Sequence, residues 1–559
     1  MFLKMNKKIS FKKFIESEKT IFFFLFSFIF VNWLLMILSE KLACNDFYPY
    51  ILASQELFVG NFSKSMSIPP LFPFLSGIIG RFFNLFLNLD GYILAGRIIS
   101  LLSGFGTLIF SYKLLKMYSR TIALFGVTFI MISSFFLKLI STAQTDMLFL
   151  FFVSGFFYYL SVNKRNLFYL IGGLLTRFEG VVLFFLYILN IASKKIKYWK
   201  YILFILPFVA FVFYQLFIKF YYRLYYTLTY VVANKSLIYY LLHPKELAYL
   251  LYNSLLYFIP VKFLDLIKWS FFLLLLMIFI IGLFCIFKNK KVVFFSVISY
   301  MLIFLSVKGA YIGKLNPIVD FRRFLSFIWL FYIIVMIGVY NVIKYIKKRK
   351  KERALLTFLI IFLMIVLIND YSIKTIHSML PIMLIIPIIV IVCIPRFNSK
   401  LFSLFIIIVL SLFSAKLYTT SINASYFYIN NDTDVGTYIF SKWVKKFDRY
   451  KVTMRYCYSY MYEYYVGKDK GIKELVYDEK IYNNRKSFFV KYFKDLKKMG
   501  IKFIYFDGYV LVNQLKKQKM LKILFEERDK GKYFKLYKTF KYKGRYAGSL
   551  VIPLYDSVE

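Results

Sequence analysis

Hydrophobic positions in this chain fall into long uninterrupted runs that short basic segments separate. The first run, residues 20–39, carries no charged side chain, and a basic N-terminal segment, residues 1–19, precedes it. A spanning helix needs about 20 mostly apolar residues. The run is too long for a signal-peptide core and no small-residue cleavage site follows it, so we predict a retained first span. Because basic loops stay on the cytoplasmic side, the N-terminus is expected to be cytoplasmic.

Residues 20–420 repeat this pattern and predict a polytopic all-α membrane domain with roughly 13 transmembrane helices. A first outer loop, residues 40–90, follows the first span, and its stretch 71–89 could lie in the membrane interface rather than cross it. Two apolar pieces around Arg177 are too short to cross cleanly. The spans predicted after the first are 91–116, 121–141, 147–162, 167–177, 180–193, 199–219, 269–287, 292–308, 323–343, 354–370, 379–395 and 401–418.

The pattern changes after residue 420. Residues 421–559 are rich in charged side chains, and their apolar positions alternate between strand-like and helical spacing. Alternating strands and helices predict a small α/β domain, which the predicted topology places on the extracytoplasmic side. The expected strands are 452–466, 501–506, 533–537 and 549–555, and the expected helices are 487–499 and 514–525.

Composition agrees with a membrane protein. The 559 residues are 60% hydrophobic, whereas a soluble globular chain is about 45–50% apolar. This excess excludes a cytosolic enzyme, a disordered protein and a secreted disulfide scaffold. The net charge of +46 comes mostly from loops and the tail, so anionic lipid headgroups and a phosphate-bearing lipid are favoured over nucleic acid as the counter-charge.

Acidic side chains are scarce in the apolar half, and a few of them indicate chemistry. Asp146 and Glu179 each sit between two apolar runs, where an acid is costly and by default marks a functional site. Asp46 stands just after the first span. On the predicted topology these acids share the outer membrane face with three arginines: Arg177, Arg322 and Arg323.

Carboxylates beside arginines at one membrane face suit a phosphate-bearing substrate whose tail lies in the lipid. A carboxylate can take a proton from an acceptor hydroxyl. Arginine can hold a phosphate leaving group in a bidentate grip and stabilise developing charge. A second carboxylate, Asp146, could help to hold a hard divalent cation such as Mg²⁺ or Mn²⁺.

Structural alternatives remain open for each of these residues. Asp46 fits a solvated loop charge, and Asp146 follows Gln144-Thr145 as an N-cap would. Arg177 with Glu179 fits a structural ion pair. The chain has only two histidines, so a histidine-based metal site or catalytic triad is not indicated.

Five short motifs in order resemble the GT-C superfamily of membrane glycosyltransferases, and are most similar to the dolichyl-phosphate-mannose–protein mannosyltransferase-like group (glycosyltransferase family 39-type). Each motif alone is weak, but the similarity covers about residues 20–330, and an extracytoplasmic α/β tail is common in that family. The motifs are Asn45-Asp46-Phe47-Tyr48-Pro49-Tyr50 followed by Pro69-Pro70-Leu71-Phe72-Pro73, Gly96-Arg97-Ile98-Ile99-Ser100-Leu101-Leu102, Thr145-Asp146-Met147-Leu148, Leu174-Leu175-Thr176-Arg177-Phe178-Glu179-Gly180 and Arg322-Arg323-Phe324.

The resemblance implies an inverting transfer of one sugar from a polyprenyl-phosphate donor. It implies that Asp46 is the acceptor-activating base, that Asp146 lies near the donor phosphate or a metal, and that Arg177 contacts that phosphate. Arg322 or Arg323 would assist from a late loop. Some relatives carry an acid or a lysine just before the proline pair, where this chain has Ser67 and Ile68. That departure weighs against a bound metal and against a second cationic side chain that binds the phosphate.

The favoured hypothesis is therefore a multi-pass glycosyltransferase of the plasma or inner membrane that acts on a protein, lipid or glycan acceptor. One alternative is a lipid-linked-sugar flippase or polysaccharide exporter. The near absence of acids from the cytoplasmic halves of the spans disfavours it. The other alternative is a ligase or polymerase of lipid-linked glycans, which would act on long glycans rather than on one sugar. No motif identifies the sugar or the acceptor.

Overall fold

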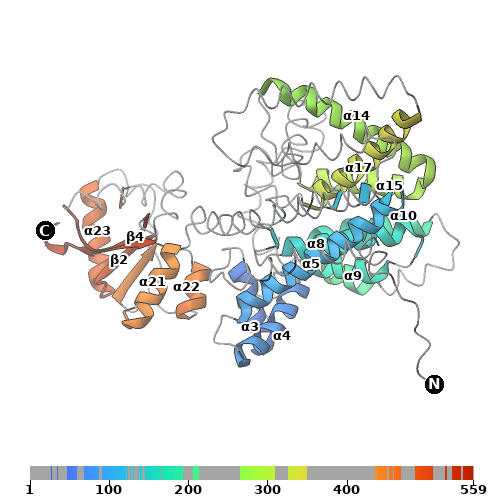
Figure 1. Ribbon diagram of the computed structural model, residues 1–559. Helices are drawn as coiled ribbons and strands as arrows, with labels where there is room; N and C mark the ends of the chain where they lie inside the picture. Colours follow the sequence, from blue (N-terminus) through green and yellow to red (C-terminus); the bar gives the residue numbers. More distant parts are fainter. Residues whose placement is uncertain are drawn as a thin grey trace, which may run out of the picture. The chain divides into compact units, whose positions relative to one another are not determined.

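The computed structural model divides into two compact units (Figure 1). Unit 1 takes residues 1–41 and 56–422, and unit 2 takes residues 42–55 and 423–559. The structure describes residues 47–59, 68–86, 91–120, 145–164, 166–192, 265–308, 325–348, 435–449, 452–456, 459–467, 485–507, 532–542 and 545–557, with single positions or short pieces in 27–34, 122–140, 205–214 and 523–524.

Unit 1 is helical in its described parts. Two of the described helices, Gly91–Lys116 and Leu325–Val342, are long and apolar enough to cross a membrane. The expected spans near 91–116, 147–162, 269–287, 292–308 and 323–343 are each a helix in the structure. The remaining expected spans, apart from the two short pieces around Arg177, lie wholly or mostly outside the described residues, and the count of 13 stays a prediction. The described helices are α4 (Leu71–Phe86), α5 (Gly91–Lys116), α8 (Thr145–Ser161), α9 (Leu167–Thr176), α10 (Val181–Ala192), α14 (Asp265–Asn289), α15 (Lys291–Lys308) and α17 (Leu325–Lys348).

Buried hydrogen bonds join the helices of unit 1. Trp329 of α17 is fully buried and donates its indole N–H to the Ser111 hydroxyl of α5 at 2.8 Å. The Tyr332 hydroxyl donates to the Gly126 carbonyl at 2.9 Å. Because a buried polar group without a partner is costly, these bonds fix how α17 is rotated against its neighbours.

Helices α14 and α17 cross at a pair of glycines. A side chain at Gly338 would collide with the carbonyl oxygen of Ile278, and one at Gly282 would collide with that of Ile334. The two backbones therefore approach as closely as small residues allow, as in membrane helix pairs generally.

Overpacking this crossing should destabilise the protein. We expect Gly338→Ile to lower the free energy of unfolding by about 1–3 kcal/mol, because the new side chain must push α14 away. The measurement is the thermal unfolding midpoint of the detergent-solubilised chain. Leu102→Ile, at an exposed position of α5, serves as the control. Equal midpoints for all three proteins would show that the close approach is dispensable.

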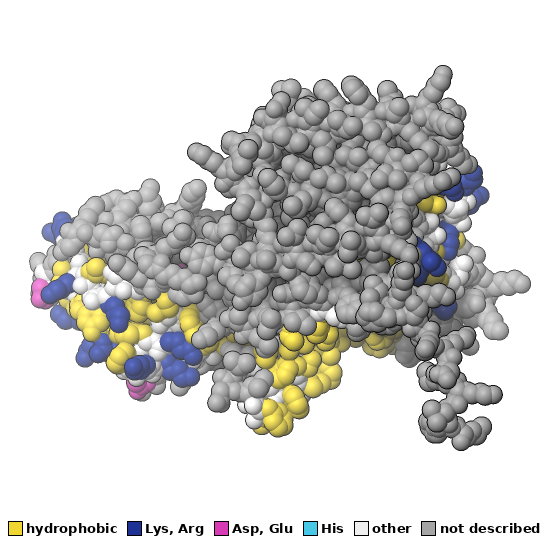
Figure 2. Space-filling model, viewed as in Figure 1, with side chains coloured by type: hydrophobic (Ala, Val, Ile, Leu, Met, Phe, Trp, Pro, Cys, Tyr) yellow, Lys and Arg dark blue, Asp and Glu magenta, His cyan; other side chains and the backbone are white. Residues whose placement is uncertain are grey.

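Helix α4 has one packed and one exposed apolar face. Its small residues Gly77 and Gly80 are buried, and Gly80 lies against Tyr92 of α5. The opposite face forms a hydrophobic surface that Figure 2 shows in yellow. An exposed apolar helix face is typical of a helix that lies in the membrane interface. This surface therefore supports the predicted interfacial position of residues 71–89, which stays a prediction. The exposed side chains are Phe74, Ile78, Phe82, Leu85 and Phe86.

Unit 2 contains a four-stranded sheet in the order β1-β2-β4-β3. Strands β1 and β2 are parallel, and β4 runs antiparallel to both β2 and β3. The helices α21, α22 and α23 accompany the sheet (Figure 1). The bounds are β1 Thr453–Tyr456, β2 Phe503–Asp507, β3 Phe534–Tyr542, β4 Arg545–Pro553, α21 Val435–Lys446, α22 Ser459–Val466 and α23 Arg485–Lys498.

The period-2 alternation of the central strand gives each sheet face its own core. Ile504 and Phe506 of β2 pack in one cluster with the aromatic side chains of α23. Tyr505 points to the other face and stacks on Phe440 of α21, with ring centroids 3.8 Å apart. Helices therefore cover both faces of the sheet.

One expected strand was wrong. A single strand is expected over 452–466, but in the structure the strand ends at Tyr456 and helix α22 begins at Ser459. Tyr462 and Val466, one helical turn apart, are both buried in the α21–α22 side of the core. Tertiary packing thus overrides the strand preference of a tyrosine-rich segment. The expected helix 514–525 lies mostly outside the described residues.

Candidate functional site

The candidate site is built at a break between two short helices. Helix α9 ends at Thr176, and the chain passes through Arg177 in an extended conformation (φ −149°, ψ 148°) into a 3-10 turn, Phe178–Gly180. The break is tight, because a side chain at Gly180 would collide with the Gly173 carbonyl. The extended backbone turns the Arg177 side chain out of the helical path.

Helix α8 brings an acid to the same place. Gly155 of α8 lies against the Tyr169 ring and Gly172 of α9 against the Phe152 ring, so the two helices run antiparallel. The end of α9 therefore lies beside the start of α8, where Asp146 occupies the first turn. A carboxylate in a helix's first turn is favoured by the helix dipole.

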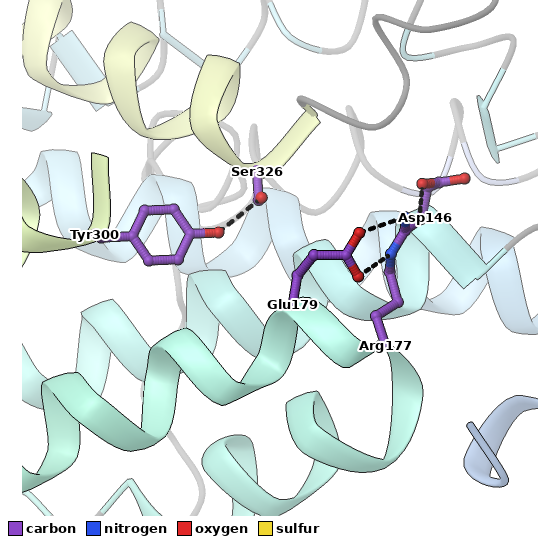
Figure 3. A network of polar contacts seen from close by, with 5 residues as sticks. All are labelled: Asp146, Arg177, Glu179, Tyr300 and Ser326. Carbon is purple, nitrogen blue, oxygen red and sulfur yellow. Dashed lines mark hydrogen bonds and ion pairs between the residues drawn. The ribbon is translucent and has the colours of Figure 1, made fainter. Parts of the chain in front are cut away.

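Arg177 lies between two carboxylates, as Figure 3 shows. Its Nε and one terminal nitrogen donate to the two oxygens of Glu179 at 3.2 and 3.0 Å. Its other terminal nitrogen forms an ion pair with Asp146. The side-chain exposures are only 16% for Arg177, 8% for Asp146 and 9% for Glu179. This Asp146–Arg177–Glu179 cluster carries two negative charges and one positive charge in a nearly dry setting.

Two further polar side chains lie close to the cluster. The Tyr300 hydroxyl of α15 donates to the Ser326 hydroxyl of α17 at 2.7 Å, and both residues are buried. Tyr300 is close enough to Glu179 and Arg177 for an electrostatic interaction, and Figure 3 shows Tyr300 and Ser326 in the same region as the cluster. Sequence reasoning missed this pair, because a tyrosine and a serine inside apolar spans carry no signal that separates them from packing residues.

The structure brings together three of the six predicted site residues. Asp146, Arg177 and Glu179 form the cluster described above. Asp46, Arg322 and Arg323 lie outside the described residues. Helix α17 begins at Leu325, two positions after Arg323. The chemical roles of all six residues stay predictions.

The described residues do not fit a divalent cation. Within them, no group of three or more His, Cys, Asp or Glu side chains could hold a metal ion. The two carboxylates of the cluster both contact the Arg177 guanidinium, which would face any cation bound there. Hard divalent cations take about six oxygen ligands. The predicted Mg²⁺ or Mn²⁺ at Asp146 therefore stays a prediction.

Comparison with known proteins identifies the fold. No protein-family model matches the chain, and no curated protein matches it. Among solved structures it is similar to ArnT from Cupriavidus metallidurans in the apo state, with a TM-score of 0.52 and 10% sequence identity over 96% of this chain and 98% of ArnT. The structure of ArnT bound to undecaprenyl phosphate gives the same TM-score and identity over 97% and 100%. At this sequence identity the likeness shows the fold alone: this chain has the fold of ArnT, in agreement with the predicted resemblance to GT-C proteins.

Proposed function

We propose that this chain, which has the GT-C fold, is an integral membrane glycosyltransferase using a polyprenyl-phosphate-linked sugar. One observation carries the proposal: a nearly buried arginine held by two carboxylates at a helix break in a chain of this fold. The binding of undecaprenyl phosphate by ArnT supports a donor of that lipid class. The acceptor is a hydroxyl group of a protein, lipid or glycan at the extracytoplasmic face.

The charge balance of the cluster favours a functional over a purely structural role. A buried ion pair is at best weakly stabilising, because desolvation offsets its Coulomb attraction. A second buried carboxylate adds a further desolvation cost that a simple ion pair does not have. Such arrangements are found where a site needs a particular charge in a particular orientation. Glu179 and Asp146 together hold the Arg177 guanidinium in one orientation.

In the proposed reaction, the acceptor oxygen attacks the anomeric carbon from the face opposite the phosphate. The bond between that carbon and the phosphate oxygen breaks, and the anomeric configuration inverts. Asp46 takes the proton of the acceptor hydroxyl. Arg177 binds the phosphate, whose negative charge grows as it leaves. Arg322 and Arg323 add positive charge from the late loop, and the product is polyprenyl phosphate.

Lipid-linked sugars from cells with and without the protein provide the test. We expect one polyprenyl-phosphate sugar to accumulate when the gene is deleted, while one glycoconjugate loses a single sugar residue. Mass spectrometry of both fractions identifies donor and acceptor together. Loss of a long glycan block would instead indicate a ligase or polymerase. Unchanged lipid-linked sugars and glycoconjugates would contradict the proposal.

A further inference from the structure

The start of the first outer loop belongs to the C-terminal unit. Residues 42–55 group with 423–559 rather than with the rest of the helical unit. This stretch contains most of helix α3 (Tyr48–Val59), whose Tyr48 side chain is fully buried. The prediction of one membrane domain over 20–420 did not include such a division.

Tyr48 makes its described contacts with helix α22. Its hydroxyl lies 3.2 Å from the Tyr465 hydroxyl, within hydrogen-bond distance. Its ring lies 5.5 Å from the ring of Tyr464 and 6.0 Å from that of Tyr465. Aromatic pairs at these distances stabilise a fold by more than the burial of their apolar area alone. Three rings and one hydrogen bond therefore join two segments that are 417 positions apart in the sequence.

Helix α22 in turn packs against the sheet and against helix α21. The Arg455 guanidinium of β1 stacks 3.8 Å from the centre of the Tyr462 ring, and both side chains are buried. Tyr465 also meets the Tyr438 ring of α21 edge-on at 5.1 Å, and Lys442 lies 5.2 Å from its centre. We call Tyr48, Tyr464 and Tyr465 the tyrosine clasp. On the α22 side, Tyr465 packs against the hydrophobic cluster that contains Tyr462.

The clasp limits where Asp46 can lie. Asp46 is two positions before Tyr48, and two residues of extended chain span at most about 7 Å. When the clasp holds Tyr48, covalent geometry alone therefore keeps residue 46 within that chain length of the Tyr48 backbone. A general base acts only when it is held within hydrogen-bond reach of the proton that it takes.

We infer that the C-terminal domain positions the catalytic loop: through the tyrosine clasp it holds the segment that carries Asp46. Tyr464 and Tyr465 are positioning residues that act through Tyr48. This inference rests on the proposed role of Asp46. It gives the C-terminal domain a role in the reaction that requires no contact with substrate.

Amide hydrogen exchange of the full-length protein in detergent tests the clasp without any assay of activity. We expect Tyr48→Ala and Tyr464→Ala each to speed exchange in peptides from 42–55 by about tenfold or more, because the local opening energy falls with each lost aromatic contact. Exchange in β2 and α23 should stay unchanged. Tyr48→Phe keeps the ring and should have a smaller effect. Leu536→Ala, at an exposed position of β3, is the control within the same unit.

Steady-state kinetics then shows whether the clasp positions Asp46 for the reaction or only attaches residues 42–55 to the C-terminal unit. We expect Tyr48→Ala to lower kcat at least tenfold with the donor KM little changed, and Tyr48→Phe to restore most of kcat. Unchanged exchange in 42–55 for both alanine variants would overturn the clasp, whatever Asp46 does. Faster exchange with normal kcat would overturn the positioning role. Full activity of Asp46→Asn would instead refute the proposed base and leave the exchange result standing.

Discussion

Asp46→Asn is expected to reduce sugar transfer by about 10²–10⁴-fold, the usual contribution of a general base. The amide has nearly the shape of the carboxylate but cannot accept the proton of the acceptor hydroxyl. Donor binding should change little, since the phosphate contact is assigned to Arg177. Transfer rates in membranes of equal protein content, measured at several donor concentrations, give kcat and KM separately.

A matched acid-to-amide change controls for expression and insertion. Glu16→Gln removes a carboxylate from the predicted cytoplasmic segment and should leave the transfer rate unaltered. Asp46→Glu keeps a carboxylate that is one methylene longer and should retain more activity than Asp46→Asn. A fully active Asp46→Asn would mean that another group takes the proton, and the motif around residues 45–50 would then be structural.

Hydrophobic runs predicted the described helices of unit 1 well, because burial of an apolar run decides where each helix lies. The span expected at 91–116 coincides with helix α5, Gly91–Lys116. The break at Arg177 was also predictable, since two short apolar pieces flank a charged pair. The scarcity of membrane acids identified Asp146 and Glu179 as site candidates before any geometry was known.

Contacts between distant segments could not be predicted in this way. The Asp146–Arg177 ion pair joins residues 31 positions apart, and Tyr48 meets Tyr465 across 417 positions. A tyrosine in an apolar span gives the same pattern whether it packs, like Tyr332, or lies beside charged groups, like Tyr300. Hydrophobic periodicity identifies a helix and its buried face, but it does not identify the neighbour on that face.

Arg177→Ala is expected to have the largest effect on the helical unit. Its removal leaves the Asp146 and Glu179 carboxylates buried without the guanidinium that both contact. Breaking a buried pair in this way costs about 3–5 kcal/mol. Transfer should also fall by about 10²–10³-fold through the lost stabilisation of the leaving phosphate. Thermal unfolding in detergent and the transfer rate are measured on the same preparations.

A charge-neutral variant separates these two effects. The triple variant Asp146→Asn, Arg177→Met, Glu179→Gln removes the buried charges together, so its unfolding midpoint should recover to near that of the original protein. Its transfer rate should stay as low as that of Arg177→Ala, because the guanidinium proposed to bind the phosphate is still missing. Arg177→Lys keeps the charge but loses the two-pronged geometry, and an intermediate rate is expected. If the triple variant recovers transfer along with stability, the cluster is only a structural ion network and the phosphate must be bound elsewhere.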